Sequence, residues 1–166
     1  MNKPKFFKKN VFFDKRGVFA PLSLETIEKR WIQSNISVNK KKYTLRGLHY
    51  QYGITSQSKL IKVINGKILD FIIDLREYSP DYNKVQFFLM EPGDELFVPF
   101  EFAHGFITLE DNTIVQYLVD NEYNPESERC ILWSTIPEIE KTIIEYDKNF
   151  NKNDLLISDK DLIHNP

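Results

Sequence analysis

The chain is poor in the residues that build a disulfide framework or a membrane span. Cys130 is the single cysteine, so an internal disulfide is excluded, and a reducing compartment fits this composition. No apolar run approaches the roughly 20 residues that cross a bilayer. Residues 1–9 are basic, but no apolar core of signal-peptide length follows them. We therefore expect a cytoplasmic protein that does not enter a membrane.

An excess of charge of one sign is also lacking. The 22 basic and 24 acidic residues give a formal net charge of −2, which offers no electrostatic basis for binding nucleic acid or an anionic membrane. The 166 residues are 42% hydrophobic and 14% aromatic, and a chain of this length buries about 70% of its unfolded surface. We expect one domain over residues 1–166 that needs neither a metal nor a disulfide to fold.

Beyond Leu45, apolar runs alternate with turn residues, as they do in β-proteins. Three turn motifs separate the predicted strands: Asn65-Gly66, Pro92-Gly93-Asp94 and Glu110-Asp111-Asn112. The first lies between apolar residues 59–64 and 67–75 and predicts a β-hairpin. Strands at this spacing predict an all-β sandwich or barrel.

Helical signals are few and lie outside this strand region. Residues 23–31 are compatible with a helix that Ser23 caps, and the C-terminal residues favour short helical or irregular elements. Lys40-Lys41-Lys42 is interpreted as a solvated turn, the usual place for a run of like charge. A few short peripheral helices are therefore expected around the β-structure.

Several polar side chains share strand faces with apolar residues of the predicted core. Because successive side chains of a strand alternate between its faces, Lys59, Tyr117, Asp70 and Asp74 each lie on the face of apolar neighbours two residues away. Buried charge is costly unless it is paired or used, so one lined cavity explains them together. Taken singly, each has an ordinary explanation: a lysine at a strand end, a core tyrosine, a carboxylate paired with a cation.

The densest polar cluster surrounds one of only three histidines. It is Arg46-Gly47-Leu48-His49-Tyr50-Gln51, followed by Gln57 and Lys59, while His104 lies between Ala103 and Gly105. The chain has no His-x-His pair, and residue 51 is glutamine where a second metal ligand would fall. We favour a neutral imidazole that a carboxylate orients and that acts as a general base. A zinc or iron site on two histidines, and two structural histidines in turns, remain as alternatives.

Taken in order, the polar segments resemble those of the dTDP-4-dehydrorhamnose 3,5-epimerase family, and the resemblance covers nearly the whole chain. The segments that carry it are Asp14-Lys15-Arg16-Gly17-Val18-Phe19, Gln33-Ser34-Asn35-Ile36-Ser37, Arg46 to Gln51, Gln57-Ser58-Lys59-Leu60, Pro99 to Phe106, Tyr117 to Tyr123, Glu128-Arg129 and Ser158-Asp159-Lys160-Asp161. This resemblance implies a jelly-roll (cupin) barrel of two antiparallel sheets. It also implies epimerisation of dTDP-4-dehydro-6-deoxyglucose at C3 and C5, with no metal and no redox cofactor.

The same resemblance implies the catalytic roles. His49 is the base that removes a proton made acidic by the C4 carbonyl, and Asp161 orients its imidazole. Tyr117 delivers a proton to the opposite face, because inversion requires an acid facing the base. Lys59 stabilises the enolate at the C4 oxygen.

Further residues match the family's substrate contacts. His104 with Asp70 resembles a second dyad that contacts the sugar, and Arg46 and Lys160 match positions that hold the diphosphate. The other expected contacts are Gln33, Asn35, Gln57, Glu128 and Tyr123, the last packing against the nucleotide base.

Family members are homodimers whose N-terminal strand completes the partner's site, and Arg16 and Phe19 match that strand. The chain departs from the family pattern at Ala20-Pro21, where an acidic substrate contact is missing. It also departs at Ile144-Glu145-Tyr146-Asp147, and its lysine-rich turn before Arg46 is one residue longer. Three alternatives to the 3,5-epimerase remain: a 3- or 5-monoepimerase of a related sugar nucleotide, a catalytically silent sugar-nucleotide-binding jelly roll, and a 3,4-ketoisomerase.

Overall fold

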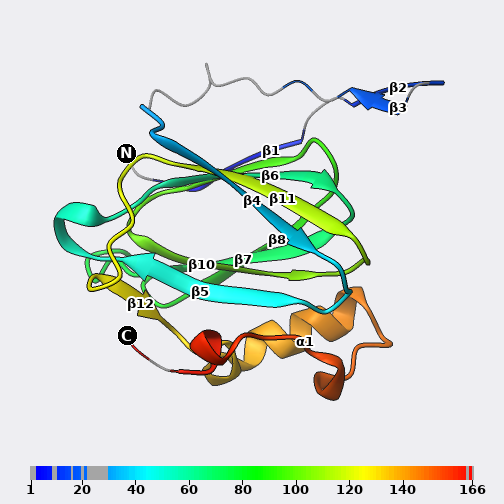
Figure 1. Ribbon diagram of the computed structural model, residues 1–166. Coiled ribbons are helices and arrows are strands. Elements are labelled where there is room, and N and C mark those ends of the chain that lie inside the picture. The colour runs from blue at the N-terminus through cyan, green and yellow to red at the C-terminus, as the bar shows by residue number, and fades with distance from the viewer. Residues whose placement is uncertain are drawn as a thin grey trace.

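Two five-stranded antiparallel sheets face each other and form the body of the molecule (Figure 1). The structure is a computed structural model that describes residues 3–8, 11–15, 17–19, 21, 30–163 and 165. The first sheet runs in the order β1 (Lys5–Phe7), β9 (Glu95–Val98), β6 (Lys59–Asn65), β11 (Thr113–Val119) and β4 (Gln33–Asn39). The second runs in the order β12 (Glu128–Cys130), β5 (Leu45–Gln51), β10 (Phe102–Thr108), β7 (Ile68–Asp74) and β8 (Val85–Met90). The expected jelly-roll barrel is confirmed.

The turn at Asn65-Gly66 does not form the predicted hairpin. Gly66 has the positive φ of 78° that such a turn requires, yet β6 and β7 pair with different neighbours and belong to opposite sheets. A Cβ on Gly66 would lie 2.3 Å from Thr113 Oγ1, so the chain passes close to β11 as it crosses over. The dipeptide specifies a tight turn, but long-range packing decides which strand each arm joins. The other two predicted turns likewise join strands of different sheets.

The alternation of side chains places one apolar layer between the sheets. This layer includes Ile61, Val63, Leu96 and Val115 of the first sheet and Ile72 of the second, all fully buried. Every residue of β7 is buried, because a second apolar layer covers the other face of its sheet. These two apolar layers pack against the strands that carry Lys59, Asp70 and Tyr117.

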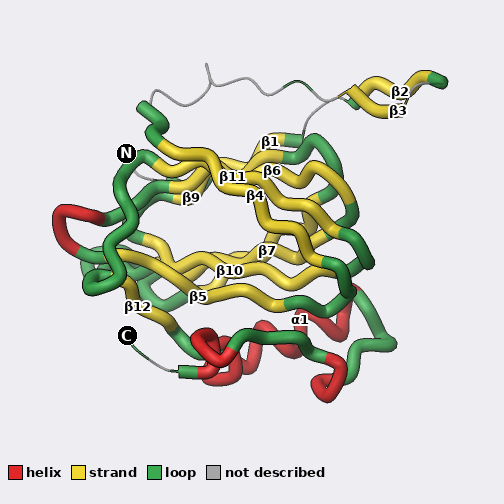
Figure 2. Tube along the Cα trace, viewed as in Figure 1, coloured by secondary structure: helices red, strands yellow, loops and turns green. Residues whose placement is uncertain are grey.

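Helix α1 (Pro137–Tyr146) packs under the second sheet (Figures 1 and 2). Pro137 stands in its first turn, where a proline costs no hydrogen bond. Ile139 and Ile143, one turn apart, are fully buried in an apolar cluster with Leu45 and Phe71. Four 3-10 turns complete the helical elements of the described residues: η1 (Gly53–Thr55), η2 (Trp133–Thr135), η3 (Lys152–Asp154) and η4 (Asp159–Leu162). The expected short peripheral helices are confirmed at the C-terminal end.

The N-terminal region contains a small ribbon separate from both sheets. Strands β2 (Phe12–Asp14) and β3 (Gly17–Phe19) pair only with each other among the described strands, and the ribbon stands apart from the barrel in Figure 2. Phe12 and Phe19 are 57% and 68% exposed. The helix expected over residues 23–31 falls largely on residues 22–29, which lie outside the described part of the chain.

Candidate active site

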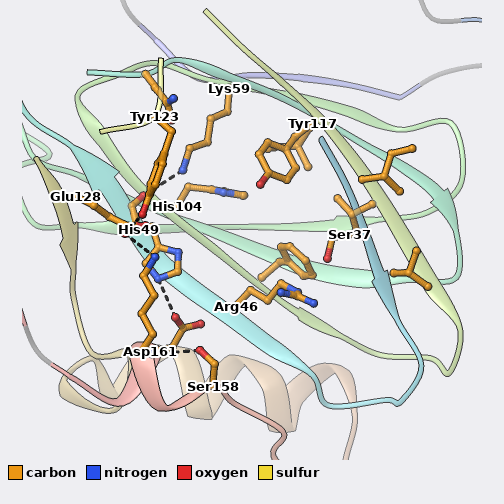
Figure 3. A pocket seen from close by; sticks show the side chains of 17 residues that line it. Ser37, Arg46, His49, Lys59, His104, Tyr117, Tyr123, Glu128, Ser158 and Asp161 are labelled. Carbon is orange, nitrogen blue, oxygen red and sulfur yellow. Dashed lines mark hydrogen bonds and ion pairs between the residues drawn. The ribbon is translucent and has the colours of Figure 1, made fainter. Parts of the chain in front are cut away.

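A cavity of about 470 Å³ opens between the two sheets. Residues of β4, β5, β6, β10, β11 and β12 line it together with the C-terminal turn η4 (Figure 3). The predicted site residues that line it are Arg46, His49, Gln57, Lys59, His104, Tyr117, Tyr123, Glu128, Lys160 and Asp161. Segments from residue 46 to residue 161 therefore meet in one place.

His49 and Asp161 form a hydrogen-bonded pair in this cavity. His49 Nε2 lies 2.9 Å from Asp161 Oδ1, and the Gly47 N–H donates to Oδ2 at 3.1 Å. Ser158 is the N-cap residue of η4, and its hydroxyl accepts a hydrogen bond from the Asp161 N–H. Burial opposes ionisation of Asp161, but the bonds from His49 and Gly47 hold its pKa below the ordinary value. A carboxylate only accepts, so Nε2 carries the proton and Nδ1 of the neutral ring keeps its lone pair.

A second histidine–carboxylate pair lies deeper. His104 Nε2 is 2.8 Å from Asp70 Oδ2, and His104 faces His49 in the register of β10 and β5. Asp70 is fully buried, and its Oδ1 has no hydrogen-bond partner among the described residues. Burial raises the Asp70 pKa, against the opposing effects of His104 and Lys59. Asp70 lies outside the cavity lining, and its hydrogen bond to His104 joins it to that lining.

Lys59 and Tyr117 enter the cavity from the first sheet. Lys59 Nζ donates to the His49 carbonyl oxygen at 3.2 Å, and burial lowers its pKa to about 8, although the nearby Asp70 and Glu128 carboxylates act in the opposite direction. Burial raises the pKa of Tyr117, with Arg46 opposing the shift, so the phenol stays protonated at neutral pH. The lysine is a cation at the cavity wall, and the tyrosine is a proton donor.

Asp74 is a carboxylate paired with a cation, the ordinary structural explanation that the sequence also allowed for a buried aspartate. It is fully buried and accepts hydrogen bonds from Arg76 Nε at 2.8 Å and Arg76 Nη2 at 2.6 Å. These bonds outweigh the opposing effect of burial and lower the Asp74 pKa. Asp74 and Asp70 share a strand face, yet only Asp70 is joined to a residue of the cavity.

Three polar side chains form a connected group at the cavity rim. The Tyr123 hydroxyl donates to Glu128 Oε2 at 2.8 Å, and Lys160 Nζ lies 2.5 Å from the same oxygen. Burial opposes ionisation of Glu128, but the bonds from Lys160 and Tyr123 lower its pKa. The Lys160 ammonium also lies 5.7 Å from the centre of the Tyr123 ring. This group presents an aromatic face beside a cation.

Some predicted residues are not brought into the cavity. Gln33 and Asn35 lie on β4 outside the lining, with Gln33 Nε2 donating to Asn35 Oδ1 at 2.6 Å. Phe19 lies in the separate ribbon, exposed and outside the lining. Arg16 lies outside the described residues. Gln57 lines the cavity, but its amide donates to the Asn121 carbonyl oxygen at 2.8 Å.

The cavity also contains residues that the sequence analysis did not assign to it: Ile36, Ser37, Val38, Ile61, Phe106, Val115 and Ser158. Period-two alternation with Lys59 and Tyr117 identifies Ile61 and Val115 as neighbours on the same faces. Ser158 occupies the N-cap position of the turn that holds Asp161. Ser37 carries no comparable sequence signal.

Within the described ranges, no group of three or more histidine, cysteine, aspartate or glutamate side chains is arranged to hold a metal ion. No helix of the described residues has the length and hydropathy needed to cross a membrane.

Comparison with known proteins identifies the family. The sequence model described as dTDP-4-dehydrorhamnose 3,5-epimerase matches residues 2–166. The chain belongs to the dTDP-4-dehydrorhamnose 3,5-epimerase family. The curated epimerase of Neisseria gonorrhoeae is 37% identical over 141 residues, a match that covers 78% of this chain and 42% of that longer protein. The expected family and isomerase class are confirmed, and the expected function, sugar-nucleotide epimerisation, is the one that the family name states.

Solved structures of the epimerase family superpose over almost the whole chain. The Bacillus anthracis epimerase, with TDP and PPi bound, is 32% identical with a TM-score of 0.81, over 97% of this chain and 92% of that one. The Legionella pneumophila dTDP-6-deoxy-D-glucose-3,5-epimerase, in complex with dTDP-4-keto-L-rhamnose, is 28% identical with a TM-score of 0.79, over 97% and 86%. The cupin architecture is thus shared with enzymes of this activity.

Proposed function

We propose that this chain converts dTDP-4-dehydro-6-deoxyglucose to dTDP-4-dehydro-L-rhamnose by inverting C3 and C5 without a cofactor. The observation that carries the proposal is the position of the base and the acid on opposite walls of one cavity. His49 stands on β5 of the second sheet, and Tyr117 stands on β11 of the first. Inversion of a carbon requires that a proton leave from one face and return to the other.

The chemistry begins with His49. The C4 carbonyl makes the hydrogens on C3 and C5 acidic, and Nδ1 of His49 takes one of them while Asp161 holds Nε2–H and stabilises the imidazolium that forms. Electron density moves onto the C4 oxygen as the enolate forms. The Lys59 ammonium, fixed in the cavity wall, stabilises this negative charge.

Tyr117 completes the inversion. Its raised pKa keeps the phenolic proton on the oxygen at neutral pH, so it donates to the enolate carbon on the face away from His49. His104, held by Asp70, contacts the sugar. Each inversion consumes one proton from Tyr117 and deposits one on His49, and exchange with water restores both groups.

The rim residues hold the nucleotide part of the substrate. Tyr123 offers its ring to the nucleobase, and Lys160 and Arg46 offer cationic donors to the diphosphate. Glu128 holds Tyr123 and Lys160 in place. We assign Gln33, Asn35 and Gln57 to further substrate contacts around this rim.

We propose a homodimer as the working form, built from a single domain over residues 1–166 in the cytoplasm. Two exposed apolar features support an interface between copies. Edge strand β4 exposes Ile36 and Val38, at 67% and 59%, and the β2–β3 ribbon exposes Phe12 and Phe19. Unpaired strand edges and apolar patches are the surfaces that oligomers cover. In the dimer, Arg16 and Phe19 reach the partner's cavity, and Pro21 supplies no carboxylate there.

The decisive test is incubation with dTDP-4-keto-6-deoxyglucose in deuterated water. Mass spectrometry and NMR of the product should show deuterium at both C3 and C5. Label at a single carbon contradicts double inversion and identifies a monoepimerase. Binding without any exchange identifies a catalytically silent sugar-nucleotide-binding protein.

A further inference from the structure

Arg46 stands between two cavities. It lines the active-site cavity and also an adjacent cavity of about 310 Å³, which Lys40, Lys41 and Leu156 help to line. The Arg46 side chain is exposed, and a long exposed side chain samples several rotamers unless a partner holds it. The guanidinium is therefore accessible from two cavities. Asp161 lines both of them, whereas His49, Lys59 and Tyr117 line the active-site cavity and not the adjacent one.

One buried side chain, in the wall of the adjacent cavity, holds Arg46 where the two cavities meet. Asn39, the last residue of β4, is 2% exposed, and its Oδ1 accepts a hydrogen bond from Arg46 Nε at 2.8 Å. Its Nδ2 donates to the Thr113 carbonyl oxygen at 3.2 Å and to the Ser37 carbonyl oxygen at 3.4 Å. Carbonyl oxygens only accept, so the amide nitrogen must face them and the amide oxygen must face Arg46. The orientation of Asn39 is thus fixed by the backbone.

Ser37 adds a second contact to the same oxygen. Its hydroxyl donates to Asn39 Oδ1 at 3.2 Å, and Ser37 itself lines the active-site cavity next to Arg46 (Figure 3). Within the described part of the chain, Nε is the guanidinium nitrogen of Arg46 that bonds a protein group. The four N–H groups on Nη1 and Nη2 stay available for a ligand.

We propose that Asn39 is a positioning residue that holds the Arg46 guanidinium toward the active-site cavity, so that Nη1 and Nη2 bind the diphosphate of the substrate. The inference rests on the proposed function for the identity of the ligand. Two parallel N–H groups of an arginine match two oxygens of a phosphate, and this geometry requires a fixed guanidinium plane. Asn39 fixes the plane without touching the substrate.

The first test compares two asparagines that flank the same strand. Asn39 pairs with Thr113 on one side of β11, and Asn65 pairs with Ile114 on the other; Asn65 Nδ2 donates to the Asn112 carbonyl oxygen. Loss of a hydrogen bond to a charged group should raise the Kd of dTDP and the KM of the substrate about tenfold in Asn39→Ala. The turnover number should stay within about twofold, because the acid–base residues are unchanged. Asn65→Ala should leave Kd, KM and kcat unchanged.

The second test separates positioning from a general structural role. Arg46→Lys has no Nε–H, so Asn39→Ala in that background should cause no further loss of dTDP affinity. An equal loss in both backgrounds overturns the proposal, as does an unchanged Kd in Asn39→Ala. This double-mutant cycle is measured as dTDP affinity and does not depend on turnover. A wild-type chain that binds dTDP but does not epimerise therefore contradicts the proposed function and leaves the role of Asn39 standing.

A measurement on the unmutated residue covers the case in which Asn39→Ala does not fold. The Arg46 Nε–H resonance, assigned by its disappearance in Arg46→Lys, should be observable and protected from solvent exchange in the wild-type chain at neutral pH. Rapid exchange of that proton, equal to that of a freely solvated arginine, overturns the proposal.

Discussion

The two histidine–carboxylate pairs have nearly the same bond length and opposite electrostatic settings. His49 lies 2.9 Å from Asp161, and His104 lies 2.8 Å from Asp70. The His49 side chain is 25% exposed and that of His104 is 9% exposed. The pKa of Asp161 is lowered by bonds that offset its burial, whereas burial raises the pKa of Asp70.

This difference assigns a role to each pair. Asp161 has both oxygens bonded and keeps its charge, so it stabilises a developing imidazolium on His49. Asp70 is fully buried, and among the described residues its Oδ1 has no hydrogen-bond partner. A full negative charge is costly in such a site, so Asp70 orients His104 without supporting a second base. Environment, rather than residue type, separates the base from the substrate contact.

The largest expected effect on the exchange rate comes from replacing the two histidines, His49 and His104, one at a time. His49→Asn should abolish deuterium incorporation at both C3 and C5, since a positioned base contributes about 10²- to 10⁴-fold. His104→Asn should retain measurable exchange and mainly raise KM. Exchange rates measured by NMR in deuterated water check both variants, and equal losses in the two contradict the assignment of a single base.

Replacing the two carboxylates should lower kcat in the same order, more at Asp161 than at Asp70, and each by less than the loss of His49. Asp161→Asn leaves an amide that can donate to Nε2 and stabilise the wrong tautomer of His49, so kcat should fall about a hundredfold. Asp70→Asn keeps an acceptor for His104 and removes a poorly satisfied charge, so kcat should fall less than about tenfold. Steady-state kinetics test this ranking; a larger loss in Asp70→Asn reverses the comparison.

Tyr117→Phe separates the two halves of the reaction. Product formation should fall about 10- to 100-fold because the proton donor is lost. Removal of the substrate proton by His49 should continue, so exchange of label out of deuterated substrate should change only about threefold. Parallel measurement of label loss and product formation checks this, and an equal fall in both rates places Tyr117 before the enolate.

Local sequence patterns predicted which polar side chains point between the two sheets. Alternation along β6, β7 and β11 placed Lys59, Asp70 and Tyr117 on inward faces, because the period of a strand fixes the side from which a side chain leaves. The same local logic failed at Asn65-Gly66, where the turn was predicted correctly and the pairing was not. A dipeptide contains no information on whether the next strand returns to the same sheet.

Local sequence patterns did not predict hydrogen-bond partners that lie far apart in the sequence. Asp161 lies 112 residues after His49, and only the family resemblance connected the two. Asn39 was missed because its orientation depends on carbonyl groups of Ser37 and of Thr113, which is 74 residues away. Pairing across sheets and buried hydrogen bonds are properties of the folded chain, and periodicity does not encode them.

The smallest expected effect is on the pH dependence of kcat/KM. It connects Asp70, the carboxylate of the deeper pair, to Lys59, which stabilises the enolate. Lys59 must be protonated to stabilise negative charge on the C4 oxygen, and burial lowers its pKa to about 8. Lysine is charged below its pKa, so kcat/KM should be retained at pH 7 and should fall as the pH rises through about 8. The nearby Asp70 carboxylate favours the charged form of Lys59 and raises this pKa.

Asp70→Asn should therefore move the alkaline limb of the kcat/KM profile to lower pH. Asp74→Asn is the matched control: Asp74 lies on the same strand face and is equally buried, but its partner is Arg76. This control should lower the melting temperature by breaking that pair and leave the alkaline limb in place. If both variants shift the limb equally, the effect reflects general loosening of β7. A shift confined to Asp70→Asn assigns the buried carboxylate a second role, that of keeping the enolate-stabilising lysine charged.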